Sequence, residues 1–159
     1  MVNVKIKIKR LEREGRLPSL PRYATEGAAA CDLEAFISGY LELDPGVRMA
    51  IPTGLSIELP EGYCAFIMAR SGLSFKKGLR LANGVGLIDS DYRGEIMVSL
   101  RNDSDETVRI DDGMRIAQML VMPVPAVTFI EADTLGETKR GEKGFGSTGF
   151  DKKKEEIVI

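Results

Sequence analysis

The chain has 159 residues, of which 43% are hydrophobic and 29% charged, and its formal net charge is −2. These values are typical of one globular domain that buries about two-thirds of its unfolded surface. The small negative charge argues against a broad electrostatic grip on nucleic acid. No apolar run approaches the roughly 20 residues of a membrane span, and the lysine-rich N-terminus lacks the apolar core of a signal peptide. We therefore expect a cytoplasmic protein without a membrane partner.

The residue types that could carry catalysis are restricted, because the sequence contains no histidine and two cysteines. The absence of histidine excludes Ser-His-Asp and Cys-His catalysis, His-ligated zinc sites and the usual zinc deaminase arrangement. An enzyme with this sequence would use a carboxylate as its base and hold any metal through oxygen. Cys31 and Cys64 lie in apolar, strand-like surroundings, which is typical of buried free thiols.

Short strands are the main predicted elements. Residues 2–9 alternate strictly between apolar and polar side chains, which predicts a half-buried strand with a lysine-rich solvent face. Further strands are predicted between turns that contain Gly and Pro, at about 31–37, 40–43, 47–51, 55–59, 63–68, 79–82, 108–110, 115–124 and 127–132. Residues 71–78 are the one predicted helix, with Ser71 at its start and Gly78 after two lysines. This pattern indicates an all-β sandwich, jelly roll or barrel.

The stretch from Gly84 to Ile96 places an acidic tip between two apolar runs, which predicts a hairpin. Asp89, Asp91 and Tyr92 lie close together in this tip. Taken alone, such a tip is more simply interpreted as a solvated turn, because Asp is a common turn residue.

Polar residues elsewhere are also candidates for a site. Arg70, Ser71 and Gly72 lie at a strand-to-helix junction, where they could form an anion site or an ordinary helix cap. Gln118 and Asp32 lie within apolar strand runs, so each side chain needs a polar or charged partner.

The C-terminal part has a different composition. After residue 132 the strand pattern stops, and we predict a β-rich domain over 1–132, a mobile arm over 133–150 and a disordered charged tail over 151–159. Residues 144–149 match G-x-G-x-x-G, but no strand precedes them and no helix can follow, which excludes a Rossmann fingerprint. A glycine-rich segment of this kind either binds phosphate through backbone N–H groups or is a flexible linker.

Five stretches, in this order, resemble the five motifs of the trimeric all-β dUTPase family. They are Ala29–Leu33, Ala69–Leu73, Gly86–Gly94, Gly113–Gln118 and Arg140–Gly149. Two positions depart from the usual pattern, since Ala30 replaces a Gly and Ala69 replaces a Pro. The resemblance implies a jelly-roll-like dUTPase β-barrel with one short helix and a flexible C-terminal arm. It also implies a homotrimer with its sites at subunit interfaces.

The activity that this resemblance implies is the Mg²⁺-dependent hydrolysis of dUTP to dUMP and pyrophosphate, by attack of water on the α-phosphorus. Such a reaction would limit uracil incorporation into DNA and supply dUMP for dTMP synthesis. Asp89 would be the general base, and Gln118 would touch the phosphates and the attacking water. Asp32 would contact Mg²⁺ through water. The resemblance gives Asp91 no role.

The resemblance also implies three sets of substrate contacts. Uracil and the sugar would contact Asn83, Gly86, Leu87 and Tyr92. The phosphates would contact Arg70, Ser71, Gly72 and Gln118. The arm would close over the substrate with Arg140, Phe145, Gly146, Ser147 and Thr148. In this arrangement Tyr92 would exclude a ribose 2′-hydroxyl, and Phe145 would stack on the uracil.

Two other functions fit parts of the same pattern. A dCTP deaminase of the same superfamily shares the Arg-Ser core of the second motif and part of the third. A non-catalytic binding protein could use the same fold. The complete tail motif and the intact Asp89 favour the dUTPase interpretation.

Overall fold

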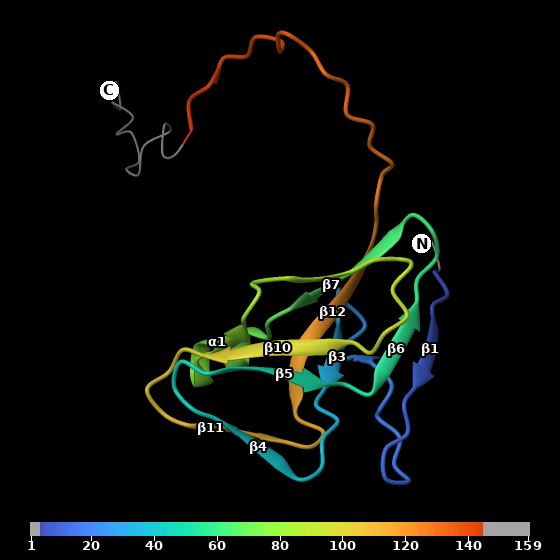
Figure 1. Cartoon of the computed structure of the whole chain (residues 1–159), viewed down its shortest axis with the longest axis vertical. Coiled ribbons are helices and arrows are strands. Elements are labelled where there is room, and N and C mark those ends of the chain that lie inside the picture. The colour runs from blue at the N-terminus through green and yellow to red at the C-terminus, as the bar shows by residue number, and fades with distance from the viewer. Residues whose placement is uncertain (1–3, 145–159) are drawn as a thin grey trace, which may run out of the picture. The chain divides into compact units, whose positions relative to one another are not determined.

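The computed structural model describes residues 4–144 (Figure 1). The chain divides into two compact units, Met1–Ala126 and Val127–Ile159. The described strands and the one described helix all belong to the first unit. They are β1 (Lys7–Arg10), β2 (Arg22–Tyr23), β3 (Cys31–Glu34), β4 (Tyr40–Leu43), β5 (Arg48–Pro52), β6 (Leu55–Glu58), β7 (Tyr63–Met68), α1 (Ser71–Lys77), β8 (Leu79–Leu81), β9 (Gly86–Ile88), β10 (Met97–Asn102), β11 (Val108–Asp111) and β12 (Arg115–Pro123).

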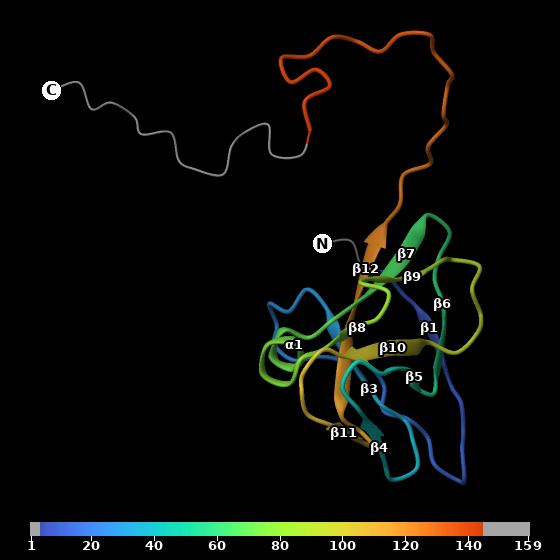
Figure 2. The same ribbon diagram turned by 60° about the vertical axis from the view of Figure 1, so that its left-hand side comes forward.

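The strands form four antiparallel sheets around a common core. Their orders are β1-β6, β5-β10-β8, β11-β4 and β2-β3-β12-β7-β9. Figure 1 shows β5 and β10 lying side by side, and Figure 2 shows β12 beside β7. The predicted all-β, jelly-roll-like fold is confirmed. Among residues 4–144 the strands form four separate sheets, and these do not join into one closed barrel.

The long strand β12 organises the five-stranded sheet, because it pairs with β3 on one side and β7 on the other. Gln118 is the partner of Asp32 on β3 and of Met68 on β7. Successive side chains on a strand point to opposite faces. Cys31 and Leu33 therefore enter the core, with 6% and 0% exposure, while Asp32 between them faces the other way.

The core is built from apolar side chains of every sheet. The largest fully buried ones include Leu33, Leu43, Ile51, Leu55, Leu79, Leu81, Ile96, Leu100, Ile110 and Ile116. Full burial of one such side chain contributes about 1.5–3 kcal/mol. These residues come from positions that alternate with polar ones, which is why the strands of this unit were predicted well from the sequence.

The predicted helix is confirmed as α1. It ends at Gly78, which adopts the left-handed conformation with φ of 64° and donates its N–H to the Leu73 carbonyl. A Cβ on Gly78 would lie 2.8 Å from the backbone nitrogen of Ser104, so both the turn and the packing require glycine. Among the described residues, no helix is long and apolar enough to cross a membrane.

The predicted hairpin over Gly84–Ile96 is wrong. Within residues 4–144, strand β9 pairs with β7 alone, whereas β10 pairs with β5 and β8, so the two strands belong to different sheets. The acidic tip is therefore a connection that passes from one sheet to another. Alternating apolar residues predict that a segment is a strand, but they do not predict its partner strand.

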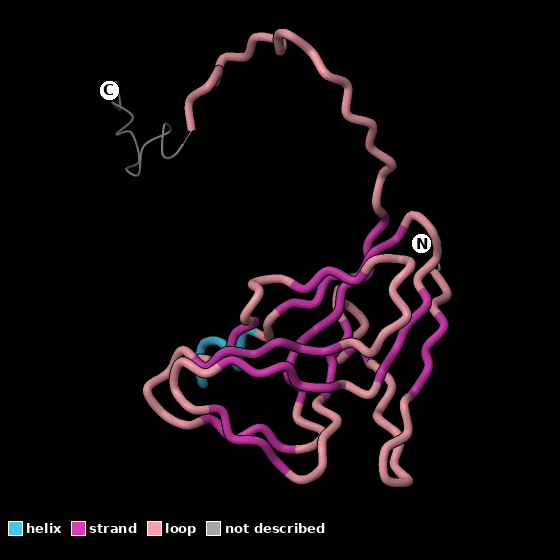
Figure 3. Tube along the Cα trace, in the orientation of Figure 1, coloured by secondary structure: helices cyan, strands magenta, loops and turns pink. Residues whose placement is uncertain are grey.

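Two other strand predictions also need correction. The N-terminal strand begins at Lys7 rather than near residue 2, and residues 1–3 lie outside the described part. Residues 127–132 form no strand, and Figure 3 shows loop throughout this stretch. Phe129 and Ile130 are 94% and 86% exposed, so the apolar pattern here has no described neighbour to pack on.

Candidate active site

A cluster of three charged side chains, Asp32, Arg70 and Arg115, spans β3, β12 and the N-cap of α1; we call it the arginine cluster. Arg70 Nε lies 2.8 Å from Asp32 Oδ1, and Arg115 Nη1 lies 3.0 Å from Asp32 Oδ2. Arg70 also donates a hydrogen bond of 3.2 Å to the backbone carbonyl of Arg115. Two guanidinium groups around one carboxylate leave a net positive charge, which suits an anion such as phosphate.

Local structure explains why the cluster forms. The side chain of Asp32 is only 17% exposed, and a carboxylate in such a position requires charged or hydrogen-bonding partners. Arg70 is the N-cap residue of α1, and Arg115 opens β12 beside β3. The sequence correctly predicted that Asp32 needs a partner. It assigned no role to Arg115, and the only available signal was the unmet requirement of Asp32 for a cation.

Gln118 makes one defined contact, since its Nε2 donates a 2.9 Å hydrogen bond to the Ala69 carbonyl. This is the partner that its place in an apolar strand requires. The contact uses the backbone of Ala69, so it does not depend on which side chain stands at position 69. Ser71 and Gly72, in the first turn of α1, are exposed next to Arg70.

The second part of the site is a cavity of about 260 Å³, which we call the tip cavity. It is lined by Ile67, Asn83, Gly86, Leu87, Ile88, Asp89, Tyr92, Glu95 and Met97. The structure thus brings together five predicted site residues: Asn83, Gly86, Leu87, Asp89 and Tyr92. A Cβ on Gly86 would lie 3.0 Å from Cβ of Ile67, so glycine lets this wall lie close against β7.

Tyr92 is held at the hydroxyl end of its side chain. Its hydroxyl donates a 2.8 Å hydrogen bond to the Glu95 carbonyl, and its ring passes over Gly94. A Cβ on Gly94 would lie 2.4 Å from the Tyr92 hydroxyl oxygen, so this arrangement needs glycine at position 94. The lining of the tip cavity contains two carboxylates, Asp89 and Glu95, and no lysine or arginine.

Among the described residues, no member of the arginine cluster lines the tip cavity. In the register of the sheet, Asp32 on β3 pairs with Gln118 on β12, and Gln118 pairs with Met68 on β7. On the other side of β7, Ile88 on β9 pairs with Ala65. The two positions are three strands apart across the sheet and three residues apart along it. At about 4.8 Å per strand and about 3.4 Å per residue, the backbones of Asp32 and Ile88 are about 18 Å apart.

The predicted arm residues fall in the second unit and are described only in part. Arg140 is exposed, and its Nε donates a 2.9 Å hydrogen bond to the Lys143 carbonyl. Phe145, Gly146, Ser147 and Thr148 lie outside the described residues.

The described residues offer Mg²⁺ no ready-made set of protein ligands, and Asp32 suits a contact through water. Within residues 4–144, no group of three or more His, Cys, Asp or Glu side chains could hold a metal ion. Both carboxylate oxygens of Asp32 are engaged by guanidinium groups. A direct metal bond would compete with these ion pairs, whereas Mg²⁺ commonly keeps several waters and binds substrate phosphates.

Comparison with known proteins agrees with this fold. A family model described as dUTPase matches residues 18–149. The deoxyuridine 5′-triphosphate nucleotidohydrolase of Desulfitobacterium hafniense (strain DSM 10664 / DCB-2) is 54% identical over 150 residues, which cover 94% of this chain and 99% of the relative. The protein of the same name from Hydrogenobaculum sp. (strain Y04AAS1) is 47% identical over 147 residues, covering 92% and 99%.

A solved structure gives the same result at the level of the fold. The Staphylococcus bacteriophage 80alpha dUTPase with dUpNHpp superposes with a TM-score of 0.81 at 25% sequence identity, covering 91% of this chain and 98% of that one. The fold and the named relatives define the class of protein as a nucleotide hydrolase. The chain belongs to the dUTPase family.

Proposed function

We propose that this protein hydrolyses dUTP to dUMP and pyrophosphate in the presence of Mg²⁺. The observation that carries the proposal is the tip cavity, which is lined by an exposed carboxylate, Asp89, together with an amide, Asn83, and an aromatic ring, Tyr92. Family membership supplies the substrate class. The reaction would limit uracil incorporation into DNA and supply dUMP for dTMP synthesis.

The tip cavity suits a deoxyuridine. The amide of Asn83 and the backbone of Gly86 and Leu87 offer both donors and acceptors to the uracil edge. The wall at Gly86 packs tightly against β7, so it has little freedom to retreat before the methyl group of thymine. The ring of Tyr92 would lie against the sugar, where a ribose 2′-hydroxyl would collide with it.

The chemistry would use Asp89 as the general base. It accepts a proton from water while the water oxygen forms a bond to the α-phosphorus. The bond from the α-phosphorus to its bridging oxygen breaks, and the electron pair leaves with pyrophosphate. Arg70, Arg115 and Ser71 would hold the phosphate oxygens, with Gln118 beside them. When bound, Mg²⁺ neutralises charge on the triphosphate and fixes its geometry.

A homotrimer would solve a problem that the single chain leaves. The base must lie within hydrogen-bond reach of the attacking water, yet the backbone of Asp32, around which the arginine cluster is built, is about 18 Å from that of Ile88 at the end of β9. No lysine or arginine is among the described residues that line the tip cavity. We propose that the arginine cluster of one copy faces the tip cavity of another, and that an arm with Arg140, Phe145, Gly146, Ser147 and Thr148 closes the site.

The decisive experiment measures pyrophosphate release from dUTP, UTP, dCTP and dTTP with Mg²⁺. We expect release from dUTP, with far lower rates for the other nucleotides. The Asp89→Asn variant should lose activity by about 10²–10⁴-fold, the usual contribution of a general base. Asp91→Asn is the matched control, because it makes the same chemical change two residues away and should keep activity.

The alternatives give different results in the same assay. Ammonia release from dCTP would identify a deaminase, and tight dUTP binding without turnover would identify a binding protein. If Asp89→Asn kept the full rate, the assignment of the base would be wrong. A monomer mass by light scattering would remove the shared site.

A further inference from the structure

The N-terminal segment contains a tight hairpin that the sequence did not reveal. Arg13 and Arg16 exchange backbone hydrogen bonds of 3.0 and 2.9 Å. The two residues between them, Glu14 and Gly15, have positive φ angles of 52° and 73°. Two-residue hairpin turns of this kind require positive φ at both central positions. Arg13 and Arg16 therefore flank the same tight turn.

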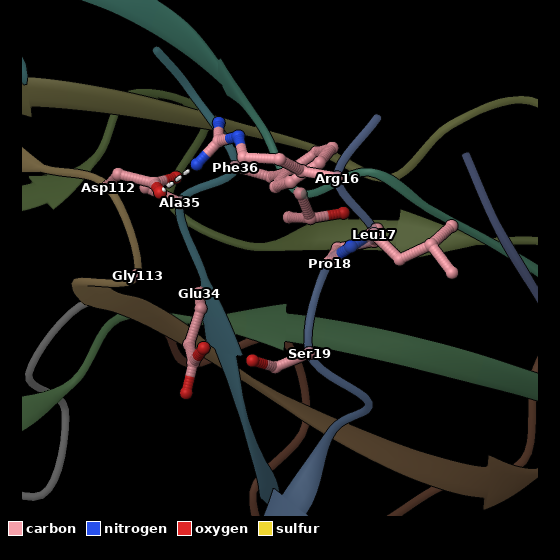
Figure 4. A pocket seen from close by; sticks show the side chains of 10 residues that line it. Arg16, Leu17, Pro18, Ser19, Glu34, Ala35, Phe36, Asp112 and Gly113 are labelled. Atoms are coloured by element: carbon pink, nitrogen blue, oxygen red, sulfur yellow. Dashed lines mark hydrogen bonds and ion pairs between the residues drawn. The ribbon is translucent and has the colours of Figure 1, made fainter. Parts of the chain in front are cut away.

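Both arginines pack on the ring of Phe36, which is only 6% exposed. The guanidinium carbons of Arg13 and Arg16 lie 5.6 and 5.3 Å from the ring centre, within the range of a cation–π contact. Arg13 also donates a 3.2 Å hydrogen bond to the Phe36 carbonyl. Figure 4 shows Arg16 beside this ring, reaching towards Asp112.

The two arginines hold different parts of the molecule. Arg16 Nη1 lies 2.5 Å from Asp112 Oδ2, in the turn between β11 and β12. Arg13 Nη2 lies 2.5 Å from Glu95 Oε2, in the connection that carries the tip cavity residues. The other oxygen of Glu95 accepts the Gly54 N–H at 2.7 Å, and the Glu95 side chain is only 16% exposed.

Glu95 links this ion pair to the proposed sugar site. Its side chain binds Arg13, while its backbone carbonyl accepts a 2.8 Å hydrogen bond from the Tyr92 hydroxyl. The connection between β9 and β10 has no ladder partner among the described strands. The position of Tyr92 therefore depends on a few discrete contacts. Arg93 Nη1 donates hydrogen bonds to the Ser90 and Tyr92 carbonyls at 2.6 and 2.9 Å, and Arg13 and Glu95 form an ion pair that ties the connection to the N-terminal hairpin.

We propose that Arg13 and Glu95 form a positioning pair that sets discrimination between deoxyribose and ribose by fixing Tyr92. This inference rests on the proposed dUTP hydrolysis. Arg13 lies outside the lining of the tip cavity and acts only through Glu95. Glu95 acts through its backbone carbonyl and through the path of residues 89–96. A displacement of about 1 Å in a positioned group can change a rate by about 10²-fold.

The test compares kcat/KM for dUTP and UTP in Arg13→Met and Glu95→Gln. Each variant removes the ion pair at nearly constant size, and Glu95→Gln keeps an acceptor for Gly54. We expect the dUTP-to-UTP ratio to fall about 10-fold in each. The double variant should be no worse than either single one, because residues in one interaction are not additive. Arg13→Lys, which keeps the charge but not the planar fork, should restore the ratio in part.

Arg16→Met is the matched control. It removes an ion pair of the same length from the same hairpin and the same aromatic ring, but this pair holds the β11–β12 turn. We expect Arg16→Met to lower the melting temperature about as much as Arg13→Met and to leave the dUTP-to-UTP ratio unchanged.

The outcomes separate the inference from the function on which it rests. If the unaltered protein hydrolyses dUTP but Arg13→Met and Glu95→Gln keep its nucleotide ratio, the positioning role is refuted and the proposed function stands. An equal fall of the ratio in Arg16→Met would also overturn it, since the effect would then be general loosening. Absence of dUTP hydrolysis in the unaltered protein would overturn both. If Arg13→Met fails to fold, Glu95→Gln and Arg13→Lys decide.

Discussion

Gly54 offers a sharp test of how the body of this protein is packed. It lies between β5 and β6 with φ of 68°, and its N–H donates to the half-buried carboxylate of Glu95. A Cβ at this position would lie 2.4 Å from Cδ1 of Phe36 and 2.8 Å from Cγ of Pro18. The Gly54→Ala variant therefore combines an unfavourable backbone conformation with a steric clash against two buried side chains.

The expected loss of stability has two parts. Holding an L-residue in the left-handed region costs about 1–2 kcal/mol. Extra volume forced into a packed region costs about 1–3 kcal/mol, because Phe36 and Pro18 must move. Together these effects predict that Gly54→Ala lowers the free energy of unfolding by about 2–5 kcal/mol, a large fraction of the stability of a typical domain.

Urea denaturation at one fixed protein concentration measures this loss, with Gly39→Ala as the matched control. Gly39 also has a positive φ, 75°, but a Cβ there would meet nothing within 4 Å. Gly39→Ala should show only the backbone part, about 1–2 kcal/mol. If Gly54→Ala were no more destabilising than Gly39→Ala, the packing of Gly54 under Phe36 would be refuted.

Three further predictions concern the site and the core. Gly94→Ala should push the Tyr92 ring away and lower the dUTP-to-UTP ratio in kinetic assays, with little change in melting temperature, because the clashing atom is the far end of a side chain. Arg115→Met should raise KM for dUTP about 10-fold, because Asp32 keeps Arg70 but the cluster loses one positive charge. Burial raises the pKa of the Cys31 thiol, so at neutral pH it should react with a thiol reagent only when the protein unfolds, as spectrophotometric titration would show.

The sequence predicted most elements of the first unit because their determinants are local. The alternation over residues 63–68 became β7, and the serine start and glycine end around 71–78 became α1. Pairing is different, because a strand partner can lie anywhere along the chain. The pattern over Gly84–Ile96 therefore suggested a hairpin, although its two strands pair in separate sheets.

The candidate site was predicted in part for a similar reason. Asp32 was recognised because a carboxylate among apolar residues needs a partner, and Asn83, Asp89 and Tyr92 were recognised through motif resemblance. The Arg13–Glu95 ion pair could not be found in this way. Both residues lie in polar stretches where a solvated charge is the ordinary expectation, and only the fold brings them to within 2.5 Å.

The separation of the arginine cluster from the tip cavity has a chemical advantage for the proposed reaction. A general base must be free to accept a proton, yet a carboxylate beside two arginines is held in ion pairs, as Asp32 is here. Asp89 is exposed and makes no ion pair within residues 4–144. If the cations arrive on another copy and bind the triphosphate, their charge is directed to the phosphate oxygens. Asp89 then remains free to accept a proton from the water. If two arginines of the same chain surrounded Asp89, they would hold its carboxylate in ion pairs instead.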